Sequence, residues 1–207
     1  MKPKLILVRH GETEGQSSIR YHGRTDVALS GLGRAQMRAA REAIRAHHGP
    51  LEFEHVFTSP LVRASEGARL IAGDSAALSV LDEFVEVHFG LFEGLTAEEI
   101  RERHPDHYAQ WNVDRLAANY TYPGGESRAA FTERVVRGVE RMLEIWRPQP
   151  GAASTALLVA HRGVIRTTVH HLTGHQPTVE LGSIQVLELD GGWQPTIVDH
   201  VIHLKGL

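Results

Sequence analysis

Along the chain, short apolar runs that are typical of strands alternate with segments in which apolar residues recur at helical spacing. The runs at 5–8 and 156–160 contain no polar residue, which is typical of strands buried on both faces of a parallel sheet. Shorter apolar runs at 56–58 and 78–81 predict two more strands, and the run at 186–189, followed by an Asp-Gly-Gly turn, predicts a closing β-hairpin. Strands that alternate with helices predict an α/β fold, here a three-layer αβα sandwich with a mostly parallel central sheet.

Apolar residues that recur every three or four positions predict three helices, over 31–47, 126–147 and 164–173. Ser30 is a suitable N-cap for the first helix, and Gly174 is a suitable residue just beyond the last one. These terminal residues agree with the periodicity, so we expect the three helices close to these bounds.

A further helix is expected after the strand at 56–58, with Ser59 as its N-cap and Pro60 at its first position. Arg63 then lies in the first turn, against the positive end of the helix dipole, at a cost of roughly 0.3–1 kcal/mol. Such a local conflict is expected where function overrides stability. Taken alone, an arginine that extends into solvent explains Arg63 equally well.

The segment before the longest helix has a different character. Thr96 and Glu99 form a capping box for one short helix, and a second short helix is predicted over 106–116. Seven of the thirteen aromatic residues lie in or beside this segment, and we interpret them as a local core rather than a substrate cage. Residues 88–125 are therefore predicted to form a small helical lid subregion within a single domain that spans residues 1–207.

Composition excludes several classes of protein. The formal net charge of −3 comes from 22 basic and 25 acidic residues that are interspersed, so no basic stripe indicates nucleic-acid binding. No apolar run could span a membrane or serve as a signal peptide, and we expect a cytoplasmic protein. The chain has no cysteine, which excludes disulfides, thiolate metal sites and cysteine-dependent catalysis.

Cationic side chains follow three of the predicted strands. Arg9 and His10 end the first strand, Arg63 follows the second, and His161 and Arg162 follow the strand at 156–160. The carboxyl ends of parallel strands open on one crevice, so these groups are expected to converge there. Guanidinium groups match phosphoryl oxygens, and the helices that follow add N–H donors, so the predicted ligand is a phosphoryl group. Neither a P-loop nor a dinucleotide-binding pattern is present.

In this crevice the best nucleophile is an imidazole, because the chain offers neither a cysteine nor a G-x-S-x-G serine. Neighbouring arginines lower a histidine pKa and keep the ring neutral, and they stabilise the charge of an in-line transition state. The leaving alkoxide needs a proton from a carboxylic acid. Glu86 and Glu93 are the candidates, since both lie where the lid joins the sheet.

Several motifs in this chain are similar to those of the histidine phosphatase superfamily, the phosphoglycerate-mutase-like group. The resemblance covers essentially the whole chain and implies the same fold. The motifs that carry it are Leu7-Val8-Arg9-His10-Gly11-Glu12-Thr13, Gly23-x-x-Asp26-x-x-Leu29-Ser30-x-x-Gly33, Thr58-Ser59-Pro60-Leu61-x-Arg63-Ala64, Phe89-Gly90-x-x-Glu93-Gly94, Pro123-Gly124-Gly125-Glu126-Ser127, and Val159-Ala160-His161 with Val164-Ile165-Arg166.

The resemblance implies roles for five of these residues. His10 becomes phosphohistidine, Arg9, Arg63 and His161 hold the phosphoryl group, and Glu86 donates the proton. Water then hydrolyses the intermediate without a metal or other cofactor. The expected activity is that of a histidine acid-type phosphatase, a phosphoric monoester hydrolase, with a small phosphorylated metabolite as its partner and no nucleic acid or membrane. A monomer and a homodimer both stay open.

Two positions depart from the family's pattern. Gly15-Gln16 stands where many members have Trp-Asn, so Gln16 is a candidate phosphate contact, and Arg162 replaces a common glycine and is another. A phosphoglycerate mutase is the first alternative, although the lid is short and Ala97 stands where a mutase lysine is expected. A phospho-ligand-binding module without catalysis is the second. His171 and His175 have a zinc-like spacing, but we interpret them as surface histidines.

Overall fold

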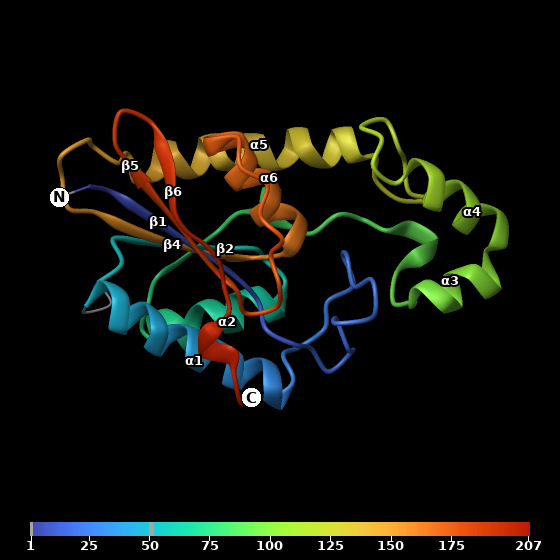
Figure 1. The fold of residues 1–207 in the computed structure, drawn as a ribbon, viewed down its shortest axis with the longest axis horizontal. Coiled ribbons are helices and arrows are strands. Elements are labelled where there is room, and N and C mark those ends of the chain that lie inside the picture. The colour runs from blue at the N-terminus through green and yellow to red at the C-terminus, as the bar shows by residue number, and fades with distance from the viewer. Residues whose placement is uncertain (1, 50–51) are drawn as a thin grey trace.

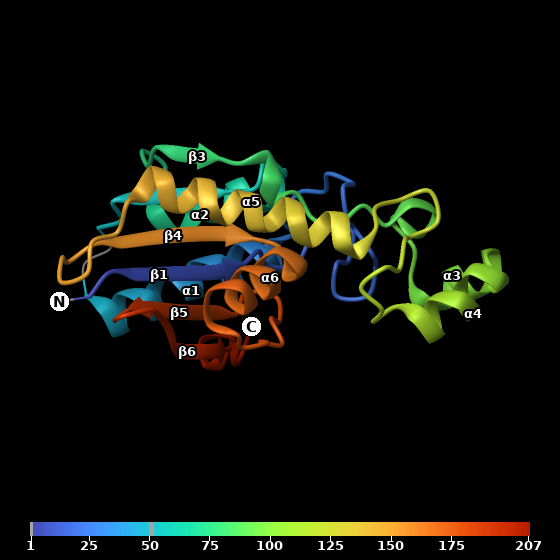
Figure 2. The same cartoon turned by 90° about the horizontal axis from the view of Figure 1, so that it is seen from above.

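A computed structural model describes residues 2–49 and 52–207 of the chain. Its centre is a six-stranded sheet in the order β3-β2-β4-β1-β5-β6 (Figures 1 and 2). Neighbouring strands from β3 to β1 are parallel, whereas β5 runs antiparallel to both β1 and β6, so the expected mostly parallel sheet and closing hairpin are both present. The strands are β1 (Lys4–Arg9), β2 (His55–Thr58), β3 (Leu78–Val80), β4 (Thr155–Ala160), β5 (Ile184–Leu189) and β6 (Trp193–His200).

Helices cover both faces of this sheet, which confirms the α/β sandwich. One layer contains α1 (Gly31–His48) and α2 (Val62–Ala72), and the other contains α5 (Arg128–Trp146) and α6 (Arg162–Thr173) (Figure 1). Successive residues of β1 point into different layers. Leu5 and Leu7 belong to the apolar cluster on the α5–α6 side, and Ile6 and Val8 belong to the cluster on the α1–α2 side. All four side chains are fully buried, which explains why the run has no polar position.

Most of the predicted helix ends are confirmed. The Ser30 hydroxyl accepts a hydrogen bond from the N–H of Gly33 at 3.1 Å, and Gly174 adopts the left-handed conformation at the end of α6. Gly33 is also required for close approach, because a Cβ atom there would lie 1.9 Å from the carbonyl oxygen of Glu12. This contact brings the start of α1 against the loop that follows β1.

Three helix starts differ from the prediction, the first being that of α5, which begins at Arg128 rather than Glu126. α2 begins at Val62 rather than Pro60, and its N-cap position is Leu61, so the prediction that Ser59 caps this helix is wrong. α6 begins at Arg162, two residues earlier than the apolar periodicity indicates. At α2 and α6 the first-turn N–H groups bind carboxylates from distant loops, Val62 to Asp26 at 2.8 Å and Gly163 to Glu86 at 3.0 Å, and neither N-cap side chain forms a capping hydrogen bond among the described residues.

The segment between β3 and α5 extends beyond the carboxyl ends of the parallel strands (Figures 1 and 2). Its helices are α3 (Ala97–Arg103) and α4 (Pro105–Asp114), and the predicted capping box at Thr96 is formed in both directions. Arg20 ties the loop after β1 to this segment, donating to Glu99 at 2.5 and 3.2 Å and to the carbonyl of Gly94 at 2.8 Å. Short 3-10 helices are η1 (Asp82–Phe84), η2 (Gly90–Phe92) and η3 (Ile202–Leu204).

The aromatic residues of this segment divide between two environments. Phe84 and Phe92 are buried in a core cluster, as predicted. Phe89, Trp111 and Tyr122 also line a cavity, so part of the aromatic group faces a ligand space. Over residues 2–49 and 52–207, no helix combines the length and the apolar character that a membrane crossing requires.

Candidate active site

The sheet order places the three cationic junctions side by side. β4 lies between β1 and β2 and is parallel to both, so the carboxyl ends of the three strands share one edge. His10 and His161 follow β1 and β4, and their rings are 5.1 Å apart between centroids in an edge-to-face arrangement. Arg9 and Arg63 line the same cavity as His10. The convergence predicted for these four side chains is therefore present.

The imidazole of His10 is held in one tautomer. Its Nδ1 lies 2.8 Å from the carbonyl oxygen of Gly11. A carbonyl oxygen can only accept a hydrogen bond, so we assign the proton of the neutral ring to Nδ1. Nε2, with its lone pair, is then the nitrogen available to the cavity.

Burial lowers the pKa of His10 well below its ordinary value, and the positive charges of Arg63 and Arg9 lower this pKa further. The ring is therefore neutral at neutral pH. The sequence predicted a neutral ring on account of the arginines alone, whereas burial is the larger cause.

His161 lies behind His10, fully buried, and is not among the residues that line the cavity. Its Nε2 is 2.8 Å from the hydroxyl oxygen of Ser59, which also accepts the N–H of Leu61. With an N–H already directed at its oxygen, the hydroxyl is free to donate to Nε2, which places the ring proton on Nδ1. That Nδ1 is buried and has no hydrogen-bond partner within the described part of the chain. A buried donor without a partner is a candidate ligand for an anion.

The two arginines are held by backbone carbonyl groups. Arg63 is 1% exposed and donates to the carbonyl oxygens of Thr25, His22 and Gly23 at 2.7–2.8 Å. Arg9 donates from Nη1 to the carbonyl of Val179 at 3.1 Å. Neutral carbonyl groups orient a guanidinium without neutralising it, so both positive charges stay available. Burial lowers the pKa of Arg9 to about 10, which still leaves the group protonated at neutral pH.

The two candidate acids have different surroundings. Glu86 is 8% exposed and lines the cavity, and its carboxylate accepts the N–H groups of Val87 and Gly163, each at 3.0 Å. Gly163 is required here, because a Cβ atom would lie 2.4 Å from Oε1 of Glu86. Glu93 instead binds the backbone N–H groups of Arg24, Thr25 and Phe89, so it holds the loop that Arg63 also holds.

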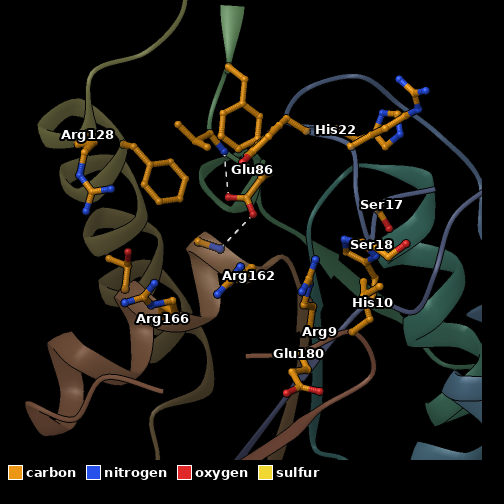
Figure 3. Close-up of a pocket in the computed structure, with 18 of the residues that line it drawn as sticks. Arg9, His10, Ser17, Ser18, His22, Glu86, Arg128, Arg162, Arg166 and Glu180 are labelled. Carbon is orange, nitrogen blue, oxygen red and sulfur yellow. Dashed lines mark hydrogen bonds between the residues drawn. The ribbon is translucent and has the colours of Figure 1, made fainter. Parts of the chain in front are cut away.

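These residues surround a cavity of about 910 Å³. Figure 3 shows Ser17, Ser18 and His22 on one side of it, Arg128 and Arg166 on the other, and Glu86 between the two sides. Arg162 lines the cavity, as expected of a cation in this loop. Gln16 is exposed and lies outside the lining residues, where Ser17 and Ser18 stand instead. No feature of the sequence distinguished these two serines from ordinary loop residues.

The sequence also gave no indication of a network that supports Arg9. Val179, the acceptor for Arg9, has a φ of 60°, which is a strained conformation for a β-branched residue. The carboxylate of Asp199 accepts the N–H groups of Thr178 and Val179, both at 2.8 Å, and Gln185 binds both the side chain and the backbone N–H of Asp199. Burial raises the pKa of Asp199, but these N–H groups lower it more, so its pKa lies below the ordinary value. Asp199 thus holds the Val179 carbonyl where Arg9 requires it.

Replacing Asp199 with asparagine is expected to weaken the binding of inorganic phosphate by about tenfold, because one charge-assisted hydrogen bond contributes roughly 1.5 kcal/mol. Isothermal titration calorimetry with phosphate measures this effect. The matched control is Asp190→Asn, in the exposed hairpin turn, where the carboxylate pairs only with Lys2. Unchanged phosphate binding in Asp199→Asn would show that Arg9 does not depend on this network.

The buried neutral histidines also predict how stability depends on pH. In the unfolded chain each histidine binds a proton below about pH 6.5, whereas His10 and His161, whose pKa values burial lowers, stay unprotonated when folded. The unfolded state therefore binds more protons in mild acid, and the free energy of unfolding falls as the pH drops below about 6.5. Each ring contributes a slope of about 1.4 kcal/mol per pH unit.

Urea denaturation at pH values between about 7.5 and 5 measures this slope. Replacing His10 with asparagine removes one titrating ring, so the slope is expected to decrease by about 1.4 kcal/mol per pH unit. His171→Asn, at an exposed position, provides the matched control. An identical slope in His10→Asn and in the unmodified protein would contradict the assignment of a neutral, buried His10.

Within residues 2–49 and 52–207, no group of three or more His, Asp or Glu side chains is arranged to hold a metal ion. The spacing of His171 and His175 therefore does not correspond to a formed cluster. The site consists of the imidazole of His10, the buried guanidinium of Arg63, the half-buried Arg9 and the Glu86 carboxylate around a cavity, with the buried imidazole of His161 packed against His10.

Comparison with known proteins places this arrangement in a family. The chain is 36% identical to the bifunctional protein Rv2228c of Mycobacterium tuberculosis over 160 residues, which are 76% of this chain but 41% of that protein. It is 32% identical to the adenosylcobalamin/alpha-ribazole phosphatase of Salmonella typhimurium over 170 residues, 82% of this chain and 79% of that one. The native structure of the mycobacterial glucosyl-3-phosphoglycerate phosphatase Rv2419c aligns with a TM-score of 0.78 at 26% identity, covering 97% of this chain and all of that one. The model of the histidine phosphatase superfamily (branch 1) matches residues 5–198, and this chain belongs to that superfamily.

Proposed function

We propose that this chain hydrolyses phosphomonoesters of small metabolites through a phosphohistidine intermediate at His10. The observation that carries the proposal is the state of His10: a neutral ring whose Nδ1–H is bound to Gly11, so that the lone pair of Nε2 is available beside Arg9 and Arg63. A nucleophile beside two positive charges is suited to attack a phosphate ester.

The proposed reaction has two steps. In the first, Nε2 of His10 attacks phosphorus, the ester P–O bond breaks, and Glu86 gives a proton to the leaving oxygen. In the second, the Glu86 carboxylate takes a proton from water, the water oxygen attacks phosphorus, and the P–N bond breaks to release phosphate and neutral His10. Arg9 and Arg63, which line the cavity, stabilise the charge on the equatorial oxygens in both steps, and His161 supports His10 through their edge-to-face contact.

The acid-type subclass is part of this proposal. Because the pKa of His10 is lowered, its nucleophilic nitrogen stays unprotonated in mildly acidic solution. Glu86 donates a proton to the leaving oxygen in the first step. Both conditions support activity that extends below neutral pH, and metal-independent catalysis follows from a nucleophile and an acid that the protein itself supplies.

The relatives support a small phosphorylated substrate, since two of them are an adenosylcobalamin/alpha-ribazole phosphatase and a glucosyl-3-phosphoglycerate phosphatase. The chain spans less than half of the length of the mycobacterial relative Rv2228c, so activities of a longer protein are not transferred. The lid contains Ala97 at the start of α3, without a lysine, which favours hydrolysis over phosphoglycerate mutation.

Turnover of p-nitrophenyl phosphate by the purified protein, with and without EDTA, tests the proposal. Equal turnover in both conditions is expected. Isomerisation of 3-phosphoglycerate that depends on 2,3-bisphosphoglycerate would instead support a mutase, and phosphate binding without turnover would support a non-catalytic module. A pH profile measured in the same assay tests the acid-type assignment, which an optimum well above neutral pH would contradict.

A further inference from the structure

The cavity contains more positive charge than one phosphoryl group requires. Seven arginines line it, whereas Glu86 and Glu180 are the acidic residues among the lining side chains that the structure describes. Arg9 and Arg63 serve the phosphoryl group in the proposed reaction, and Arg20 is paired with Glu99. The arginines without an assigned role are Arg115, Arg128, Arg162 and Arg166.

Three of these four side chains come from two adjacent helices. Arg128 is the first residue of α5, and Arg162 is the first residue of α6, with Arg166 one turn further along. α5 and α6 pack against each other. Figure 3 shows Arg128 and Arg166 at the α5–α6 side of the cavity, across Glu86 from Ser17 and Ser18, and Arg162 nearer the centre, below Glu86. We call Arg128, Arg162 and Arg166 the α5–α6 arginine cluster.

This cluster is unfavourable for the folded protein alone. Arg128 and Arg162 place cations at the positive ends of two helix dipoles, and neither helix has an acidic residue in its first turn. Arg162 and Arg166 are also a like-charge pair four residues apart on one helix. A sequence that keeps three such conflicts around one cavity indicates a functional requirement.

The guanidinium groups of the cluster also lack anionic partners. Among the described residues none of the three forms an ion pair, and Nε of Arg128 is buried without any hydrogen-bond partner. Arg162 donates only to the carbonyl of Thr178, at 3.2 Å. Partial burial lowers the pKa of Arg166, and the charges of Arg162 and Arg128 lower it further, whereas that of Asp199 raises it. An anion between them would remove this repulsion.

We infer that the α5–α6 arginine cluster is a subsite for a second anionic group, a carboxylate or a phosphate, on the leaving group of the substrate. The inference rests on the proposed function and narrows its substrate class to phosphomonoesters with two anionic groups. Its position fits the leaving group, because Glu86, which protonates the leaving oxygen in the proposed reaction, lies next to Arg162 and between His10 and the other two arginines in the view of Figure 3. Guanidinium forks bind both carboxylate and phosphate in bidentate geometry.

Matched substrates test the inference. 3-Phosphoglycerate and glycerol 3-phosphate differ by a carboxylate in place of a hydroxymethyl group, and propane-1,3-diol bisphosphate and 3-hydroxypropyl phosphate differ by a second phosphate. In one or both pairs, we expect kcat/KM to be at least about tenfold higher for the substrate with the second anionic group. A single charge-assisted hydrogen bond is enough to give a difference of this size. The pair with the larger ratio identifies the anion as a carboxylate or a phosphate. Ratios near one in both pairs would overturn the inference.

A double variant, Arg162→Gln with Arg166→Gln, is expected to reduce the larger ratio to within about threefold of one, because the charge-assisted contacts are lost. Arg38→Gln with Arg137→Gln removes the same net charge from exposed positions outside the cavity and is expected to keep the ratio. The cavity variant should also melt at a higher temperature, since the like-charge repulsion and the unfavourable dipole contact are relieved. An unchanged ratio in the cavity variant would contradict the subsite.

Binding to a His10→Ala variant separates this inference from the proposed function. Without the nucleophile, the variant is expected to bind each substrate without hydrolysing it. Calorimetry then gives the dissociation constants for both members of each pair. A preference of about tenfold for the doubly anionic member supports the subsite even if the chain proves to have no phosphatase activity. Equal affinities would overturn it even if phosphatase activity is confirmed.

Discussion

His10→Ala is expected to reduce the turnover of p-nitrophenyl phosphate by about 10⁴-fold or more, because no other side chain can form the covalent intermediate. His161 cannot replace it. Its Nε2 is bound to Ser59, and the ring is fully buried behind His10. The replacement of the buried His10 by the smaller alanine should not unfold the protein, because the adjacent strands β1 and β4 pair along their whole length. Steady-state kinetics, with a thermal melt of the same preparation, measure both effects.

Two further observations complete this prediction. His171→Ala, at an exposed position on α6 outside the cavity, provides the matched control and should retain full activity. Rapid mixing with a ³²P-labelled substrate should trap a phosphoprotein that is stable in alkali and labile in acid, as a phosphoramidate is, and His10→Ala should trap none. A trapped acid-stable phosphoester, or residual turnover close to that of the unmodified protein, would exclude His10 as the nucleophile.

The convergence of the site could be predicted from the sequence because it depends on the sheet. A fully apolar run indicates a strand covered on both faces, and parallel strands share one edge, so the residues that follow β1, β2 and β4 must meet. The cap residues Ser30 and Thr96 could be predicted for a similar reason. Their hydrogen bonds join residues three positions apart, and the sequence displays that spacing directly.

Contacts between distant loops could not be predicted in this way. Ser59 looks like a helix cap because its local sequence supports one, but its hydroxyl is used by His161, 102 residues away along the chain. The carboxylate of Asp199, on β6, accepts the N–H of Val179, whose backbone is strained, and no periodic pattern in the sequence indicates this contact. The α5–α6 arginine cluster did have a signal: two arginines four residues apart, Arg162 and Arg166, with no acidic residue beside them. That signal becomes interpretable only when the packing of α5 against α6 brings Arg128 to the same cavity.

Glu86→Gln is expected to separate substrates according to their leaving groups. Loss of a general acid lowers the rate by about 10²–10⁴-fold when the leaving oxygen is a strongly basic alkoxide, as in glycerol 3-phosphate. p-Nitrophenolate leaves without a proton, so its release from the ester should slow by less than about tenfold. Glutamine keeps the size of Glu86 and an oxygen that can accept the N–H of Gly163 or Val87, so the fold of this junction is preserved.

The ratio of the two rates, rather than either rate alone, tests the role of Glu86. The comparison uses kcat/KM, which reports the first step and not the shared hydrolysis of the phosphohistidine. A residue that only shapes the cavity would lower both kcat/KM values alike, whereas loss of a proton donor raises the ratio of kcat/KM for p-nitrophenyl phosphate to that for glycerol 3-phosphate by about 10- to 10³-fold. Glu93→Gln is the control, because Glu93 binds backbone N–H groups of the 24–25 loop and does not line the cavity. Its effect on the two substrates should be equal. A constant ratio in Glu86→Gln would show that Glu86 is not the proton donor. The next residue to test would then be Glu180, the other acidic side chain among the lining residues that the structure describes.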